Sequence, residues 1–165
     1  VDTIIDNQLN MLPSDLHFIR QKLLSSIGIS NAKIAYEAFK NTFNSERFKQ
    51  LLTKGANVQR PLWASTSTKN RDLSDVLYID SLIGENTVNT VPDNTLKAFI
   101  DHGSPSIRLY DGVFQAEENI GLLESNGINL DKSLDQLLIE GIQSFTQSYD
   151  ELILNIESKI KSLSH

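Results

Sequence analysis

The sequence predicts an α/β fold built from parallel βαβ units, followed by a helical C-terminal region. Two short β-rich segments, Arg60–Ala64 and Thr87–Val91, alternate with helical segments, which is the pattern of parallel βαβ units. The segment between them, Ser74–Ile83, carries apolar residues at helical spacing. After Ser104–Pro105–Ser106 the remaining residues follow helical periodicity only.

Length and composition indicate one ordinary globular domain, residues 1–165, with 39% apolar and 22% charged residues. The net charge of −6 argues against a nucleic-acid or anionic-membrane partner, because phosphate binding needs a cationic surface. No apolar run approaches the roughly 18 residues of a membrane span. The absence of cysteine excludes disulfides, zinc thiolates and thiol nucleophiles, and fits a cytoplasmic location.

Helical periodicity dominates residues 1–54, the region before the first predicted strand. The start of the chain has no basic region and no initiator Met, so we expect no signal peptide and a start inside a larger gene product or after processing. Ser45 is the expected N-cap of the fourth helix, which Gly55 closes. The expected helices are 3–12, Leu16–Leu24 with a break at Gly28, Ser30–Asn41 and Glu46–Lys54.

Residues 55–103 contain both predicted strands and the helix that follows each of them. Asp93 or Asn94 is the expected cap of the second of these helices, Thr95–His102, and Gly103 ends it. Residues 104–165 are expected to form three helices, 112–126, 131–145 and 146–163. Their predicted core faces comprise Leu122, Leu123, Leu134, Leu137, Leu138, Phe145, Leu152, Ile153 and Ile156.

The loop after the first strand is hydroxyl-rich and ends in a cation, which makes it a candidate anion site. Ser65, Thr66, Ser67 and Thr68 can donate hydrogen bonds, and Lys69 supplies a positive charge. Asn70 can orient the loop or bind directly. A helix N-terminus near Ser74 would add free N–H groups. From the residues alone, a polar turn with a solvated lysine is the stronger interpretation.

Several polar or aromatic residues near this loop have a structural explanation that we favour over a functional one. Trp63 is more easily explained as a core aromatic than as a sugar-stacking residue. Arg60 is expected to form a structural ion pair. Asn89 and Thr90 are expected to pack, with approach to a substrate as the alternative.

The titratable residues elsewhere give no metal or acid–base signal. The histidines, His17, His102 and His165, have no metal-ligand spacing. His102 is expected near a helix C-terminus, where a cation is favourable. Asp72 and Asp75 are interpreted as helix caps.

The chain resembles the last third of transaldolases of the bacterial and cyanobacterial type. Several separated motifs occur in the order in which that family has them, over nearly the whole chain. The segments that carry the resemblance are Val1–Thr3, Asn31–Tyr36, Gly55–Asn70 (GANVQRPLWASTSTKN), Ser74–Tyr78, Asn86–Pro92 and Phe99–Gly103.

This resemblance implies a partial TIM (β/α)8 barrel, with strands 7 and 8, their helices and additional C-terminal helices. It implies an enzyme of the pentose phosphate pathway that uses no cofactor. A lysine Schiff base would carry a dihydroxyacetone unit from a ketose phosphate to an aldose phosphate. The expected substrates are of the fructose 6-phosphate and sedoheptulose 7-phosphate class.

The resemblance also implies which functional residues belong to this chain. Ser65 and Lys69 fall where the family places a serine and a basic residue on the sugar phosphate, so the expected phosphate-binding set is Ser65, Thr66, Lys69 and Asn70. The family's strand-4 Ile-Lys-Ile-Pro motif is absent, as are its early carboxylates and its strand-6 arginine. We therefore expect no catalytic residue and no metal site in this chain.

A (β/α)8 barrel needs about 250 residues and eight strands. The two predicted strands cannot close a barrel, so we expect the N-terminal part of the same enzyme as a partner, with a homodimer as a further option. The alternative is a catalytically inactive half-barrel that serves as a binding or regulatory module. An aldolase-like activity in place of transfer is not separable from transaldolase activity in this sequence.

Overall fold

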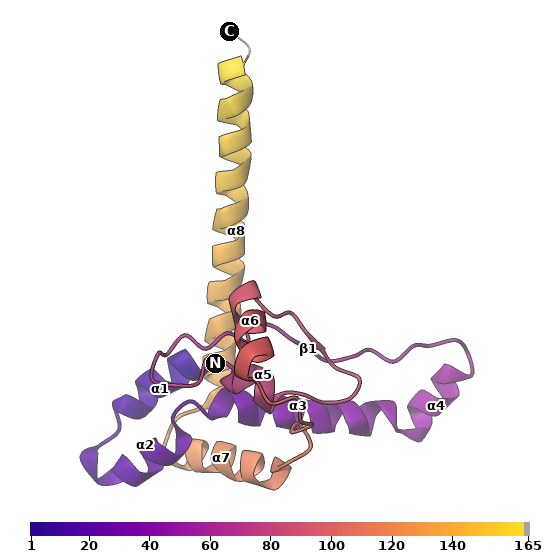
Figure 1. Ribbon diagram of the computed structural model, residues 1–165, viewed down its shortest axis with the longest axis vertical. Coiled ribbons are helices and arrows are strands. Elements are labelled where there is room, and N and C mark those ends of the chain that lie inside the picture. The colour runs from indigo at the N-terminus through magenta and orange to yellow at the C-terminus, as the bar shows by residue number, and fades with distance from the viewer. Residues whose placement is uncertain (164–165) are drawn as a thin grey trace.

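The N-terminal third is entirely helical in the computed structural model, which describes residues 1–163 (Figure 1). Ser45 caps α4 as predicted, because its hydroxyl accepts a 3.2 Å hydrogen bond from the backbone N–H of Phe48. The elements are α1 (Asp2–Asn10), the 3-10 turn η1 (Ser14–Leu16), α2 (His17–Leu23), α3 (Ile27–Phe43) and α4 (Glu46–Leu52).

Two parallel strands form the sheet of the described chain, in agreement with the predicted βαβ unit. β1 (Leu62–Trp63) pairs with β2 (Val88–Asn89), and α5 (Leu77–Ser81) lies between them in sequence. The backbone N–H of Val88 donates to Pro61 O at 2.9 Å, and that of Thr90 donates to Trp63 O at 3.0 Å. Both strands are shorter than predicted, and each has one paired edge within residues 1–163.

The C-terminal region contains two helices after α6 (Asp93–His102), where three were predicted. α7 (Val113–Ser125) is followed by α8 (Leu130–Leu163), a single helix of 34 residues that projects far from the body (Figure 1). The predicted break at 145–146 was wrong because no Gly or Pro interrupts residues 142–163. At 1.5 Å per residue, α8 is about 51 Å long. No helix among the described residues is both long and apolar enough to cross a bilayer.

Two predicted helix boundaries were also wrong. Gly28 does not break the chain; it is the second residue of α3, and the break lies at Ser25, where φ is +55°. Neither Asp93 nor Asn94 caps α6, because that helix begins at Asp93 directly after Pro92 and has no side-chain cap. Proline favours this position because its fixed φ suits a helix start.

The main core joins the first helices to α7 and the beginning of α8. Its buried residues come from α1, α2, α3 and the segment around the α7–α8 turn: Ile5, Leu9, Leu23, Ile27, Leu123, Ile128 and Leu130. A second cluster, Tyr36, Leu82 and Leu109, lies under the sheet and packs against Trp63. This second cluster fixes β1 and its following loop against α3.

The predicted core faces of the C-terminal helices are correct only close to this body. Leu123 is buried, and Leu122 and Leu134 pack against the main core. The distal residues are exposed instead, because α8 projects beyond every element that it could pack against. Their exposed fractions are 62% for Leu138, 83% for Phe145, 55% for Leu152, 37% for Ile153 and 46% for Ile156.

Candidate functional site

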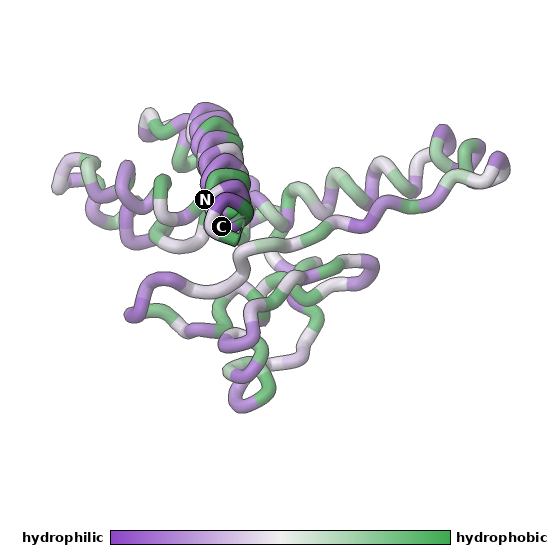
Figure 2. Tube along the Cα trace, turned by 90° about the horizontal axis from the view of Figure 1, so that it is seen from above, coloured by the Kyte–Doolittle hydropathy of each residue, from purple (hydrophilic) through white to green (hydrophobic). Residues whose placement is uncertain are grey.

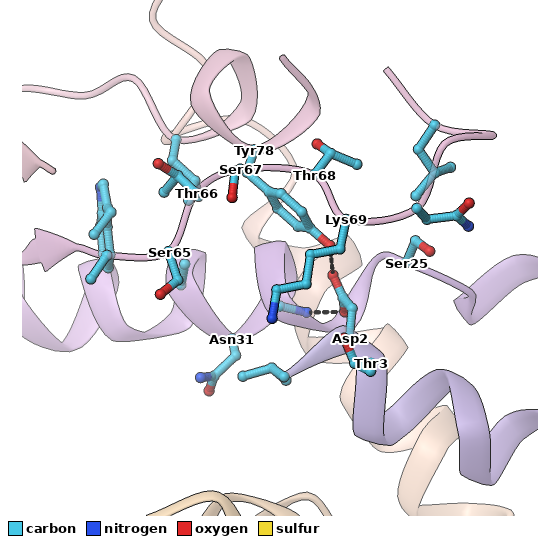
Figure 3. A pocket seen from close by; sticks show the side chains of 18 of the residues that line it. Asp2, Thr3, Ser25, Asn31, Ser65, Thr66, Ser67, Thr68, Lys69 and Tyr78 are labelled. Atoms are coloured by element: carbon cyan, nitrogen blue, oxygen red, sulfur yellow. Dashed lines mark hydrogen bonds between the residues drawn. The ribbon is translucent and has the colours of Figure 1, made fainter. Parts of the chain in front are cut away.

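A pocket of about 610 Å³ opens at the carboxyl end of β1, where the hydroxyl-rich loop leaves the sheet (Figure 3). The loop residues Ser65–Asn70 form one wall of the pocket, and residues of α1 and α3 form the facing wall. Carboxyl ends of parallel strands are the usual place for ligand sites in α/β proteins. The predicted site residues Ser65, Thr66, Lys69 and Asn70 all line this pocket.

Ser65 and Thr66 begin the loop and have different surroundings. Ser65 adopts a left-handed conformation with φ of +56° and is exposed. Thr66 is buried, with 3% of its surface exposed, and its hydroxyl donates a 2.8 Å hydrogen bond to Asn89 Oδ1. Because Asn89 ends β2, this bond fixes the start of the loop to the neighbouring strand. Asn89 was expected to pack, and its role as the partner of Thr66 agrees with that expectation.

Lys69 and Asn70 end the loop. The Lys69 side chain is exposed and extends across the pocket in front of Tyr78, toward Asn31 (Figure 3). The Asn70 carboxamide accepts a 2.9 Å hydrogen bond from the backbone N–H of Asp72, which is a local turn of the kind that orients a loop. In this structure Asn70 therefore shapes the loop, while Lys69 is the side chain of the loop that brings a positive charge.

The expected helix N-terminus beside the loop is not formed. α5 has five residues and begins at Leu77 rather than near Ser74. Asp75 does not cap it, because that helix has no side-chain cap. The predicted capping role of Asp72 was wrong as well, because the N-cap position of α5 is Val76, four residues after Asp72. Among the described residues, the helix dipole predicted beside the loop is therefore not part of this pocket.

Asp2 lies at the floor of the pocket as a buried carboxylate, with 7% of its surface exposed. It accepts a 2.6 Å hydrogen bond from the Tyr78 hydroxyl and a 2.7 Å hydrogen bond from the backbone N–H of Gly28 (Figure 3). Burial and the bond to Asp2 raise the pKa of the Tyr78 hydroxyl. These two hydrogen bonds stabilise the buried carboxylate of Asp2. They also join α1, α3 and α5 at the floor of the pocket.

A second carboxylate, Asp6, lies one turn further along α1 and also lines the pocket. It accepts 2.9 Å hydrogen bonds from both the backbone N–H and the hydroxyl of Ser25. These bonds stabilise the left-handed turn that ends α2. Among the side chains lining the pocket, Lys69 is thus accompanied by two carboxylates, and the lining by itself does not favour an anion.

Trp63 and Arg60 differ in how well they follow their predicted roles. Trp63 packs against the second core cluster, as expected of a core aromatic. Its indole Nε1 and the Thr68 hydroxyl are both buried without a hydrogen-bond partner among the described residues. Arg60 is exposed and makes no ion pair within residues 1–163, so the structural ion pair predicted for it was wrong.

His102 is the last residue of α6, at the helix C-terminus as predicted. Its ring contacts Asp75 Oδ1 at 2.8 Å and Asp101 Oδ2 at 3.1 Å. Hydrogen bonds to Asp75 and then Asp101 raise the pKa of the imidazole above its ordinary value. The contact joins the end of α6 to the segment between the loop and α5. His165 lies outside the described residues.

From the sequence, lysines on helices are expected to be solvated charges, and Lys33 on α3 differs from this expectation. Its ammonium donates a 2.5 Å hydrogen bond to the backbone carbonyl of Asp111. Burial lowers the pKa of this lysine, and the Asp111 carboxylate acts in the opposite direction. No group of three or more potential metal-ligating side chains occurs within residues 1–163.

The sequence analysis missed Asp2 and Tyr78 as residues of the site. Tyr78 was assigned to a helical segment and Asp2 to the start of the chain, without a role in the site. No periodicity links two residues that are 76 positions apart. The available signal was that both lie in segments that carry the family resemblance, Val1–Thr3 and Ser74–Tyr78.

Comparison with known proteins gives a consistent result. A family profile described as "Transaldolase/Fructose-6-phosphate aldolase" matches residues 2–156. The chain is 49% identical over 140 residues to "Transaldolase 2" of Nostoc punctiforme and 43% identical over 169 residues to "Transaldolase 2" of Nostoc sp. PCC 7120. It is 41% identical over 154 residues to "Transaldolase" of Mycolicibacterium smegmatis.

These matches differ in how much of each protein they cover. They include 84%, 99% and 93% of this chain, but 37%, 44% and 41% of the respective relatives. The chain therefore spans about two-fifths of the length of the curated relatives that it matches.

Proposed function

The chain belongs to the transaldolase family, and we propose that it forms the C-terminal part of a (β/α)8-barrel transaldolase. In this proposal β1 and β2 are strands 7 and 8 of the barrel. The remaining strands belong to an N-terminal part, which corresponds to the portion of the relatives outside the matched segment. The proposal is supported by the parallel pairing of the strands, since every strand of such a barrel is parallel to its neighbours.

The proposed reaction transfers a dihydroxyacetone unit from a ketose phosphate to an aldose phosphate. The amine of a lysine attacks the ketose carbonyl, and loss of water from this adduct forms a Schiff base. The protonated imine accepts the electron pair of the bond between its α and β carbons, so that an aldose phosphate leaves and the three-carbon unit stays on the lysine. The retained unit then adds to the carbonyl of the acceptor aldose phosphate, and hydrolysis of the new Schiff base releases the product. That lysine lies outside this chain in our proposal. On the strength of the family alone, we assign the reaction to the pentose phosphate pathway in the cytoplasm.

This chain contributes the site for the substrate phosphate. The observation that carries the proposal is the position of Lys69, whose side chain extends across a pocket at the carboxyl end of β1 (Figure 3). Barrel enzymes commonly bind phosphate in the loops after strands 7 and 8. The exposed hydroxyl of Ser65 can donate to the phosphate, and Asn70 holds the loop in shape.

Thr66 has a positioning role in this proposal. Its hydroxyl donates to Asn89 Oδ1 at 2.8 Å, and a bond to phosphate would require that hydroxyl to turn away from its buried partner. The bond fixes the strand-8 end against the strand-7 loop. The loop is thus fixed at its start by Thr66 and at its end by Asn70. It therefore loses little conformational freedom when Ser65 and Lys69 bind a phosphate.

The charge of the pocket requires a further cation from outside this chain. Asp2 and Asp6 line the same pocket as Lys69, and a phosphate dianion would be repelled by both. An arginine at the end of strand 6, as the family resemblance implies, would supply the missing charge and a bidentate donor pair. The phosphate would then contact Lys69 and this arginine, while Asp2 and Asp6 keep their hydrogen bonds to Tyr78, Gly28 and Ser25.

A chimera tests this proposal. In it, the present chain replaces the matched segment of "Transaldolase 2" from Nostoc punctiforme. We expect the chimera to convert fructose 6-phosphate and an aldose phosphate, and borohydride to trap a covalent adduct on a lysine outside this chain. The isolated chain should form no adduct.

The opposite outcome has a clear meaning. A folded chimera without transfer activity and without an adduct would overturn the transaldolase proposal for this chain. If the isolated chain were then also a folded monomer, the inactive binding or regulatory module would become the better explanation. Free glyceraldehyde 3-phosphate released without an acceptor would indicate an aldolase in place of a transferase.

A further inference from the structure

The outer part of α8 carries an uncovered apolar surface, which we call the α8 stripe: Leu138, Ile142, Phe145, Tyr149, Leu152 and Ile156. The exposed fractions of these side chains lie between 46% for Ile156 and 83% for Phe145. Figure 1 shows the helix rising clear of the other elements, and Figure 2 looks nearly along it, with hydrophobic positions recurring on successive turns. Contiguous apolar surface of this extent is typical of an interaction site.

The residues of the stripe recur at intervals of four, three, four, three and four. At about 100° per residue they fall within roughly 80° of the helix circumference. Further exposed apolar residues, Ile139 and Ile153, lie beside this sector and widen the apolar surface. An apolar surface that follows the helical repeat for about 27 Å fits packing against other helices and does not fit a strand edge. The occupant of the α8 stripe is therefore helical.

The α8 stripe continues a seam that already exists at the base of the helix. Leu130 is buried and Leu134 partly buried in the main core, where α8 contacts α1 and α7. Gln8 of α1 donates a 3.1 Å hydrogen bond to the Ser133 hydroxyl in the same region. Leu134 lies on the same side of the helix as Leu152, so the covered seam runs into the stripe without a change of face.

The position of the N-terminus indicates which part of the protein covers the α8 stripe. α8 contacts α1 at its base, and both views mark the N-terminus beside α8 (Figures 1 and 2). Segments that precede α1 in sequence would therefore emerge next to the seam. The relatives have more than half of their length outside the matched segment, which is ample to cover the stripe.

We infer that the α8 stripe is the docking surface for helices of the N-terminal part of the same protein. In the completed barrel, α8 then packs along the outer helices. This inference rests on the proposed function for the existence of that part. The inference identifies the surface of this chain that holds the N-terminal part in place. This surface is distinct from the free edges of the sheet, where further strands would pair through backbone hydrogen bonds.

An anionic membrane fits the stripe poorly, because acidic residues such as Asp150, Glu151 and Glu157 lie on α8 and amphipathic membrane helices need a cationic polar face. The tethered N-terminal part also has the advantage of a high effective concentration over any separate chain.

Thiol labelling of the chimera tests the inference, since this chain contains no cysteine. Ile156→Cys places a thiol in the stripe, and Ser158→Cys places a matched thiol two residues away on the opposite side of the helix. Labelled peptides identified by mass distinguish these sites from cysteines of the N-terminal part. We expect the Cys introduced at 156 to react at least about tenfold more slowly than that at 158, with the difference abolished in denaturant.

The outcomes separate the inference from the proposed function. Equal labelling rates in a folded chimera would overturn the inference, even if the chimera were an active transaldolase. Protection that depends on protein concentration, together with a dimeric mass, would assign the stripe to a second copy and would also overturn it. Concentration-independent protection in an inactive monomer would support the docking surface and count against the proposed function alone.

Discussion

The Tyr78 hydroxyl donates a 2.6 Å hydrogen bond to Asp2 Oδ2, across 76 residues of sequence. Asp2 begins α1, and Tyr78 lies in α5, the first helix after the loop that ends in Lys69 and Asn70. The bond therefore connects the floor of the candidate pocket to the segment that holds the proposed phosphate loop. Because Asp2 is buried, each of its donors contributes to keeping the carboxylate in place.

Replacement of Tyr78 by Phe is expected to destabilise the chimera by about 1–3 kcal/mol, because a buried carboxylate loses a donor. Asp2→Asn should have an effect of similar size. The double variant should be less destabilised than the sum of the two, with a coupling energy of about 0.5–3 kcal/mol. Urea denaturation of all four proteins measures this coupling, and additive effects would show that the two residues act independently.

Gly28 and Gly121 form a matched pair of helical glycines that should respond oppositely to alanine. A Cβ at Gly28 would lie 3.0 Å from Asp2 Oδ2, whereas a Cβ at Gly121 would meet nothing within 4 Å. Gly121→Ala should raise the free energy of unfolding by about 0.5–1 kcal/mol through helix propensity. Gly28→Ala should lose this gain or lower the stability, because Asp2 must move. Equal stabilisation by both substitutions, measured by thermal unfolding, would contradict the close packing at Asp2.

His102 should titrate above pH 6.5, since Asp75 and Asp101 raise its pKa in the folded state. A raised folded pKa means that the contact stabilises the fold fully below the unfolded pKa. That stabilisation is lost as the pH rises through the folded pKa, which lies above the ordinary value of 6.5. Titration of the ring protons by NMR measures the pKa. Asp75→Asn should lower it more than Asp101→Asn does.

Tyr78 gives stability a second pH dependence, at alkaline pH. Its hydroxyl pKa is raised from the ordinary value of 10.0 by burial and by the bond to Asp2. The folded state therefore retains this proton where the unfolded state loses it, and stability falls as the pH rises above about 10. The Tyr78→Phe chimera should lose part of this alkaline dependence. An unchanged pH–stability curve between the two proteins would contradict the assignment.

Lys69→Ala should weaken binding of the phosphorylated substrate in the active chimera by about 1.5–3 kcal/mol, the usual contribution of a charged hydrogen bond. This corresponds to an increase in KM of roughly 13- to 160-fold with a smaller change in kcat, since the phosphate is remote from the reacting carbonyl. Lys97→Ala, on the exposed surface of α6, is the control and should leave KM unchanged. Equal kinetics for the two variants would remove Lys69 from the site.

Local sequence patterns predicted most helices and both strands, but not their exact ends. Ser45 was identified as an N-cap from its position alone, because a cap depends on residues within one turn. Asp75 was wrongly interpreted as a cap because its preferred partner, His102, is 27 residues away in sequence. The continuous α8 was wrongly divided because a long periodic pattern does not state where a helix must stop.

For the candidate site, the sequence predicted the loop but not the partners of its side chains. The loop Ser65–Asn70 could be found from its composition and from the family resemblance, and these residues do line one pocket. Neither signal could assign Thr66 to Asn89, since side-chain partners depend on which strands become neighbours. Lys33 likewise looked like a solvated charge until the packing of α3 brought its ammonium to the Asp111 carbonyl.

The sequence by itself determined the family, the parallel strand pair and the loop that carries Lys69, because these depend on residue types and spacings within short segments. Only the tertiary structure decided that Asp2 meets Tyr78, that the anchored seam of α8 ends near Leu134, and that the remaining stripe is uncovered. Such contacts arise from long-range packing, in which many arrangements are compatible with one apolar pattern, and the fold selects the arrangement that buries the most surface while satisfying its buried polar groups.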